Sequence, residues 1–91
     1  MRVHWSNKAL AQLADITGGL QFHSVPAADR LADELIAASY RLATFPQLGR
    51  MLPEGNFAEV RELFVGKYRL VYTAGDFQIE IIAILHQAQR R

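Results

Sequence analysis

The sequence of 91 residues contains no cysteine, which excludes disulfide bonds and thiolate zinc sites. Long apolar runs are missing too. The most apolar segment, Ile79–Leu85, is interrupted by Glu80 and is far shorter than the roughly 20 residues of a membrane-spanning helix. The chain opens Met1-Arg2-Val3-His4-Trp5, without the apolar core of a signal peptide. We therefore expect a cytoplasmic protein with no membrane partner.

Motifs for bound cofactors are also absent. The glycines have neither the Walker nor the Rossmann context that cradles a phosphate. The three histidines, His4, His23 and His86, fall in separate predicted elements, without a second ligand at metal-binding spacing. We therefore expect neither a cofactor nor a metal.

What is present is typical of one soluble domain covering residues 1–91. Half of the residues are hydrophobic and 21% are charged, close to the average for globular domains. The net charge of +1 is too small to indicate nucleic-acid binding by itself. The C-terminal third is richer in cations, with five basic residues from position 61 onward against three acids: Arg61, Lys67, Arg69, Arg90 and Arg91 against Glu62, Asp76 and Glu80.

Two amphipathic helices are predicted in the first half. Apolar residues recur at helical spacing from Lys8 to about Gly18. The pair Gly18-Gly19 is predicted to end that helix, because glycine readily adopts the left-handed closing conformation. Ser24 and Pro26 mark the start of the second helix, as capping residue and first-turn proline. Phe45-Pro46 is predicted to end it, because a residue before proline is pushed away from helical angles.

Strands are predicted before and after the helices. Met1–Trp5 alternates in polarity and is predicted to form a short first strand. A connecting loop is predicted over Gln47–Asn56. Three β-patterned runs follow, separated by Gly66-Lys67 and Gly75-Asp76, which indicates two antiparallel hairpins: Ala58–Phe64, Tyr68–Ala74 and Gln78–Leu85.

The last of these runs is apolar on both faces, which is typical of an interior strand. Simple alternation puts four side chains on one face and two on the other: Ile79, Ile81, Ala83 and Leu85 against Ile82 and Ile84. The order β-α-α-β-β-β indicates an α+β fold, with two N-terminal helices packed on one face of a small, largely antiparallel sheet.

Arg61, Arg69 and His86 come from three neighbouring predicted strands or their ends, so strand pairing can bring them together. A guanidinium can hold a scissile phosphate and stabilise charge that develops on it. An imidazole can act as general acid or base. In RNA the neighbouring 2′-hydroxyl would attack, which requires no metal. The structural alternative is a set of solvated arginines and a hydrogen-bonded histidine, with Glu62 paired to its neighbour Arg61.

The motifs and their order resemble the RelE/ParE superfamily of toxins from type II toxin–antitoxin modules, of the plasmid-stabilisation type. Trp5-Ser6 with Ala9 and Leu13 resembles the opening strand and helix of that superfamily. Three further stretches resemble its "L..FP..GR", "RE…G.YR..Y" and "I…H" motifs: Leu42–Arg50, Val60–Tyr72 and Ile84–His86. The resemblance extends over nearly the whole chain and implies a compact toxin neutralised by a cognate antitoxin. The antitoxin is expected to cover an apolar groove beside the helical pair and the cationic rim of the sheet.

The superfamily divides into ribosome-dependent mRNA endonucleases and ParE-type inhibitors of DNA gyrase. For an endonuclease acting on the ribosome and mRNA, the resemblance implies that Arg69 holds the phosphate, His86 is the general acid and Arg61 stabilises the transition state. However, Gln87 stands where those enzymes often place a tyrosine, and lysines are scarce. The motifs are closer to the ParE branch.

We therefore expect a toxin that inhibits gyrase by binding. The predicted target contacts are the basic residues and the histidine of the C-terminal third: Arg61, Lys67, Arg69, His86, Arg90 and Arg91. Ribosome-dependent cleavage of mRNA is the alternative. A third possibility is an inactive member of the fold that serves as a structural or interaction protein.

Overall fold

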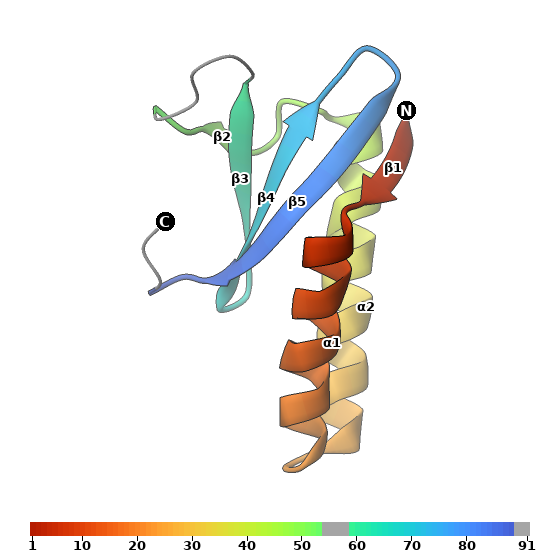
Figure 1. The fold of residues 1–91 in the computed structure, drawn as a ribbon, viewed down its shortest axis with the longest axis vertical. Helices are drawn as coiled ribbons and strands as arrows, with labels where there is room; N and C mark the ends of the chain where they lie inside the picture. Colours follow the sequence, from red (N-terminus) through yellow and green to blue (C-terminus); the bar gives the residue numbers. More distant parts are fainter. Residues whose placement is uncertain (54–58, 89–91) are drawn as a thin grey trace.

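A computed structural model describes residues 1–53 and 59–88. Within these ranges, the elements occur in the order β1 (Arg2–Trp5), α1 (Asn7–Gln21), α2 (Val25–Thr44), β2 (Arg50–Met51), β3 (Val60–Val65), β4 (Tyr68–Ala74) and β5 (Gln78–His86). The two helices lie side by side against one face of the sheet (Figure 1). This confirms the predicted α+β fold.

The sheet has five strands in the order β1-β5-β4-β3-β2. β1 pairs with β5 in parallel, and all the other pairs are antiparallel. The two hairpins and the interior position of β5 are confirmed. The predicted loop, in contrast, contains the short strand β2, because Arg50 and Met51 pair with Glu62 and Arg61 of β3. The predicted strand start at Ala58 and the predicted loop end at Asn56 lie outside the described residues.

The first helix does not end at Gly18-Gly19, where the sequence predicted its end. α1 continues through Gly18 and Gly19 to Gln21, and its capping residue Phe22 remains in right-handed helical geometry. The chain turns into α2 through consecutive backbone hydrogen bonds, including Phe22 N–H to Gly19 and Ser24 N–H to Leu20. No left-handed residue is needed for this turn, so the glycine pair is accommodated in the helix.

Ser24 caps α2 as predicted, and Ser6 caps α1 in the same way. The Ser6 hydroxyl accepts a hydrogen bond from Ala9 N–H at 3.0 Å, and the Ser24 hydroxyl accepts one from Ala27 N–H at 3.1 Å. These bonds satisfy N–H groups that have no partner within the first turn of a helix. α2 ends at Thr44, immediately before Phe45-Pro46, as predicted.

The main core lies between the helices and the sheet. Its largest buried side chains come from α2 and from the two longest strands: Leu35, Leu42, Leu70, Tyr72, Ile79 and Ile81. A smaller cluster on the other face contains Leu52, Val71 and Ala83, with Val60, Ile82 and Leu85 packed against it. The sheet is therefore apolar on both faces. Neither helix of the described chain combines the length and the apolar character needed to cross a membrane.

A β-bulge changes the predicted faces of β5. Val71 pairs with Ala83 but its neighbour Tyr72 pairs with Ile81, so Ile82 has no opposite residue. The extra residue exchanges the two faces from that point onward. Ile84 therefore joins the core under the helices, and Ala83 and Leu85 pack on the opposite face. The predicted grouping of Ala83 and Leu85 with Ile79 and Ile81 is wrong.

Candidate functional site

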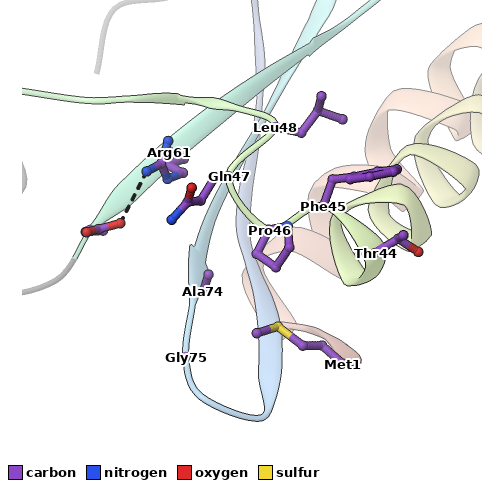
Figure 2. Close-up of a pocket in the computed structure, with 10 residues that line it drawn as sticks. Met1, Thr44, Phe45, Pro46, Gln47, Leu48, Arg61, Ala74 and Gly75 are labelled. Carbon is purple, nitrogen blue, oxygen red and sulfur yellow. Dashed lines mark hydrogen bonds and ion pairs between the residues drawn. The ribbon is translucent and has the colours of Figure 1, made fainter.

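Arg61 lies at the start of β3, where its guanidinium supports the loop that leaves α2. Its Nη1 donates to the Gly49 carbonyl at 2.8 Å, and its Nη2 lies 3.4 Å from the Glu59 carboxylate. The side chain is only 13% exposed. Figure 2 shows Arg61 at one side of a cavity of about 640 Å³, bordered by the α2 exit and the β4–β5 turn. Arg61 thus has a structural role and presents little of its charge to solvent.

Tyr72 holds the same loop from within the core. Its hydroxyl accepts a hydrogen bond from Gly49 N–H at 2.9 Å and donates one to the Pro46 carbonyl at 2.8 Å. Burial raises the pKa of Tyr72 from its usual value, while the bond from Gly49 and the charge of Arg61 oppose that rise. The "FP..GR" motif therefore corresponds to a loop segment whose main chain is bound to the sheet.

Arg69 lies on the opposite face of the sheet, in a buried ion-pair network. Its Nη1 lies 3.0 Å from Glu62 Oε2, and Arg50 contacts the other oxygen of this carboxylate at 2.8 Å. Glu62 is 2% exposed and Arg69 is 6% exposed. Glu62 thus pairs with Arg50 and Arg69, whereas Arg61 pairs with Glu59. The predicted pairing of Glu62 with Arg61 is not observed, because adjacent residues of a strand point to opposite faces.

His86 and Lys67 lie near the β3–β4 turn, and both are exposed. The His86 ring packs edge-on against Tyr68, with 5.4 Å between ring centroids, and its Nδ1 accepts a hydrogen bond from Ala88 N–H at 3.2 Å. Tyr68 itself packs against the main core. The two remaining predicted contacts, Arg90 and Arg91, lie outside the described residues.

The strand register separates the three residues predicted to act together. Arg61 lies opposite Tyr72, and His86 lies opposite Tyr68. These two partners are four residues apart on β4, or about 13 Å at the usual rise per residue. Arg69 Nη2 donates to the main-chain carbonyl of His86 at 3.4 Å. However, Arg69 follows Tyr68 in β4, so the two side chains project from opposite faces of the sheet. Arg61, Arg69 and His86 therefore do not converge on one cleft.

Arg50 is a charged site residue that sequence reasoning missed, since it was noted only within a helix-exit motif. Its guanidinium lies 5.8 Å from the ring centroid of Phe64, in cation–π contact. Its side chain is 70% exposed although two of its nitrogens contact Glu62. The available signal was its place one residue after Gly49, in a loop where an extended segment can begin. Across residues 1–53 and 59–88, no group of three or more His, Asp or Glu side chains could hold a metal ion.

The architecture of two helices on a five-stranded sheet is the fold of ParE- and RelE-like structures. The chain is similar to a solved structure described as the chromosomal ParDE TA system from P. aeruginosa, with a TM-score of 0.77 and 20% identity over 94% of this chain and 95% of that chain. It is also similar to the YoeB dimer from Staphylococcus aureus, with a TM-score of 0.62 and 16% identity over 94% and 95% of the two chains. No curated protein matches significantly.

The family described as the ParE toxin of the type II toxin–antitoxin system, parDE, matches residues 3–91. Because this match extends over nearly the whole chain, the protein belongs to the ParE toxin family.

Proposed function

We propose that this toxin inhibits DNA gyrase by binding to it in the cytoplasm, and that a cognate antitoxin neutralises it. The observation that carries the proposal is the separation of Arg61, Arg69 and His86. Cleavage of a phosphodiester by these residues would require all three within hydrogen-bond reach of one phosphate. Their placement on two faces and at two ends of the sheet favours binding over this chemistry.

The exposed groups suggest which of the predicted contacts meet the target. Arg61 and Arg69 are engaged by Glu59 and Glu62, and their side chains are 13% and 7% exposed. Lys67 and His86 are exposed and lie at one end of the sheet. They are the described residues best placed for direct contact. Arg61 and Arg69 would act by maintaining the shape of the sheet, and Arg90 and Arg91 remain further candidates.

A supercoiling assay with purified gyrase tests the proposal. Stoichiometric toxin is expected to reduce supercoiling, and added antitoxin is expected to restore it. In cells, expression of the toxin alone should cause double-strand breaks while translated messages stay intact. Cleaved messages with intact DNA synthesis would instead identify an endonuclease and overturn the proposal.

Substitution of His86 separates these two activities further. His86→Ala is expected to reduce toxicity less than tenfold, because one exposed contact is lost from a larger interface. A general acid at this position would give a loss of about 100-fold or more. His23→Ala is a matched control, because His23 is an exposed histidine in the turn between the helices. Growth arrest at graded expression levels measures both variants.

A further inference from the structure

A cavity at one end of the sheet has no part in the proposed function. It has a volume of about 640 Å³, within the range of sites that take small molecules. The end of α2 with the loop after it, the start of β3 and the β4–β5 turn border this cavity. Figure 2 shows Arg61 across the cavity from Phe45 and Thr44. The proposed target contacts Lys67 and His86 lie at the other end of the sheet.

Hydrogen bonds to the sheet fix the loop that forms one wall of the cavity. The Tyr72 hydroxyl binds the main chain of both Pro46 and Gly49. Arg61 Nη1 donates to the Gly49 carbonyl at 2.8 Å, and the Tyr72 side chain is itself buried. The loop therefore cannot fold into the cavity without breaking these bonds. A wall that is held in place before a ligand arrives removes the cost of ordering it on binding.

Most of the lining is apolar. Three of its large side chains are about half exposed: Met1 at 50%, Phe45 at 61% and Leu48 at 47%. Pro46 and Ala74 add further apolar surface. Exposed apolar side chains grouped around a hollow are typical of binding sites. A ligand with an apolar body would remove them from water, and the gain follows the apolar area that it covers.

Arg61 is the cation of this lining, and one edge of its guanidinium has an incomplete set of partners. Nη1 is bound to Gly49, as described above. On the other edge, Nη2 has a contact of 3.4 Å with the Glu59 carboxylate, and Nε is buried without an acceptor among the described residues. Nε and Nη2 together can bind a carboxylate through two parallel hydrogen bonds. A buried donor without a partner is costly, so this edge favours an incoming acid.

Glu59 occupies this edge of Arg61 weakly. Its side chain is 59% exposed, and exposed ion pairs contribute little to stability. A second acid can therefore displace Glu59 into solvent at small cost. The remaining polar side chains of the described lining, Thr44 and Gln47, are neutral and exposed, so they do not repel a negative charge. The cavity thus combines one position for a carboxylate with an apolar surface.

We propose that this cavity binds a small carboxylic acid with an apolar body. The carboxylate accepts hydrogen bonds from Nε and Nη2 of Arg61 in place of Glu59, and the apolar body covers Phe45 and Leu48. A neutral amide of the same shape lacks the charge-assisted bonds. This site goes beyond the proposed function and does not depend on it, because the contacts proposed for gyrase lie at the other end of the sheet.

NMR titration of the isotope-labelled toxin tests the site, with hydrocinnamate as the probe. Two controls separate its features: hydrocinnamamide keeps the shape without the charge, and propionate keeps the charge without the aromatic body. Hydrocinnamate is expected to shift the amide signals of Leu48 and Gly75, which line the cavity. It is also expected to bind about tenfold more tightly than either control, as loss of a charge-assisted bond or of apolar contact predicts.

Three outcomes of this titration would overturn the proposal. They are equal affinities for hydrocinnamate and hydrocinnamamide, shifts confined to residues outside the cavity, and no shift at millimolar hydrocinnamate. Each of them would leave the proposed function intact, because the titration contains neither gyrase nor antitoxin. Failure of the toxin to inhibit gyrase would likewise leave the binding result unchanged.

Two variants locate the bound acid. Arg61→Gln removes the cation and is expected to lower the affinity for hydrocinnamate to that for hydrocinnamamide. Ala74→Leu fills the cavity from β4, leaves Arg61 in place and is expected to weaken binding about tenfold or more. Ala11→Leu, at an exposed position on α1 outside the lining, is the matched control and is expected to bind like the wild type.

Thermal unfolding shows which of these variants are folded. Because Arg61 also supports the loop through Gly49, Ala74→Leu keeps the test decisive if Arg61→Gln does not fold. Wild-type affinity of folded Ala74→Leu would place the bound acid elsewhere and overturn the proposal.

Discussion

At the scale of single residues, Gly49 is fixed by the space around it. A Cβ at this position would lie 2.7 Å from the Glu62 carbonyl oxygen and 2.7 Å from the Tyr72 ring. Backbone and a buried ring cannot move aside easily. Gly49→Ala is therefore expected to lower the free energy of unfolding by about 1–3 kcal/mol, as overpacking does elsewhere. Urea unfolding followed by circular dichroism measures the effect.

Gly18→Ala is the matched control for this substitution. No atom lies within 4 Å of a Cβ built at Gly18, and the residue lies inside α1. Alanine is favoured over glycine in a helix by about 0.5–1 kcal/mol, so this variant is expected to be more stable than the wild type. Equal destabilisation of both variants would refute the steric explanation for Gly49.

The Tyr72 hydroxyl is expected to make the free energy of unfolding depend on pH in the alkaline range. Burial raises its pKa above the ordinary value of 10.0, so the folded state favours the neutral hydroxyl more than the unfolded state does. The stabilisation is complete below pH 10 and is lost as the pH rises through the raised pKa. The difference in unfolding free energy between wild type and Tyr72→Phe should therefore be constant up to about pH 9 and shrink above pH 10. Urea titrations at successive pH values test this, and a difference that grows with pH would contradict it.

Arg61 and Arg69 were identifiable from sequence as candidate site residues, but their burial was not. Arg61 and Arg69 stand out as cations in strands, and a strand usually exposes one face. Here both faces are covered by apolar clusters, so both guanidinium groups are enclosed and paired. The pairing of Glu62 with Arg50 depends on the short strand β2. This strand has only two residues, too few to show the alternation of polar and apolar residues that indicates a strand.

At the scale of elements, the helices were predictable because caps and periodicity act locally. The serines at both N-termini and the proline after α2 specify their boundaries by direct contacts. Gly18-Gly19 misled the prediction because glycine permits a helix end without requiring one.

A side chain from α1 contacts β5 next to its bulge. Ile84 N–H, two residues after the unpaired Ile82, donates to Gln12 Oε1 at 2.7 Å. Gln12→Leu would leave a partly buried donor without its partner, which typically costs about 1–3 kcal/mol. Ala11→Leu, one position earlier on the exposed side of α1, is expected to be nearly neutral. Urea unfolding of both variants tests this, and equal stabilities would show that the bulge does not need Gln12.

At the scale of the whole molecule, the layered arrangement followed from the order of the elements, whereas the separation of Arg61, Arg69 and His86 did not. Periodicity indicates which elements exist and which faces are apolar. It does not specify register, and one inserted residue in β5 is enough to exchange its faces. The spatial relation of Arg61, Arg69 and His86 depends on register at every strand between them.

The parallel pairing of β1 with β5 joins segments 76 positions apart. A ribosome synthesises β1 long before β5, so the sheet cannot form completely until β5 has been made. Contacts between such distant segments also slow folding, because a long loop must be closed before they form. Newly made chains therefore pass through a stage in which β1 has no partner strand and the sheet lacks its interior strand β5.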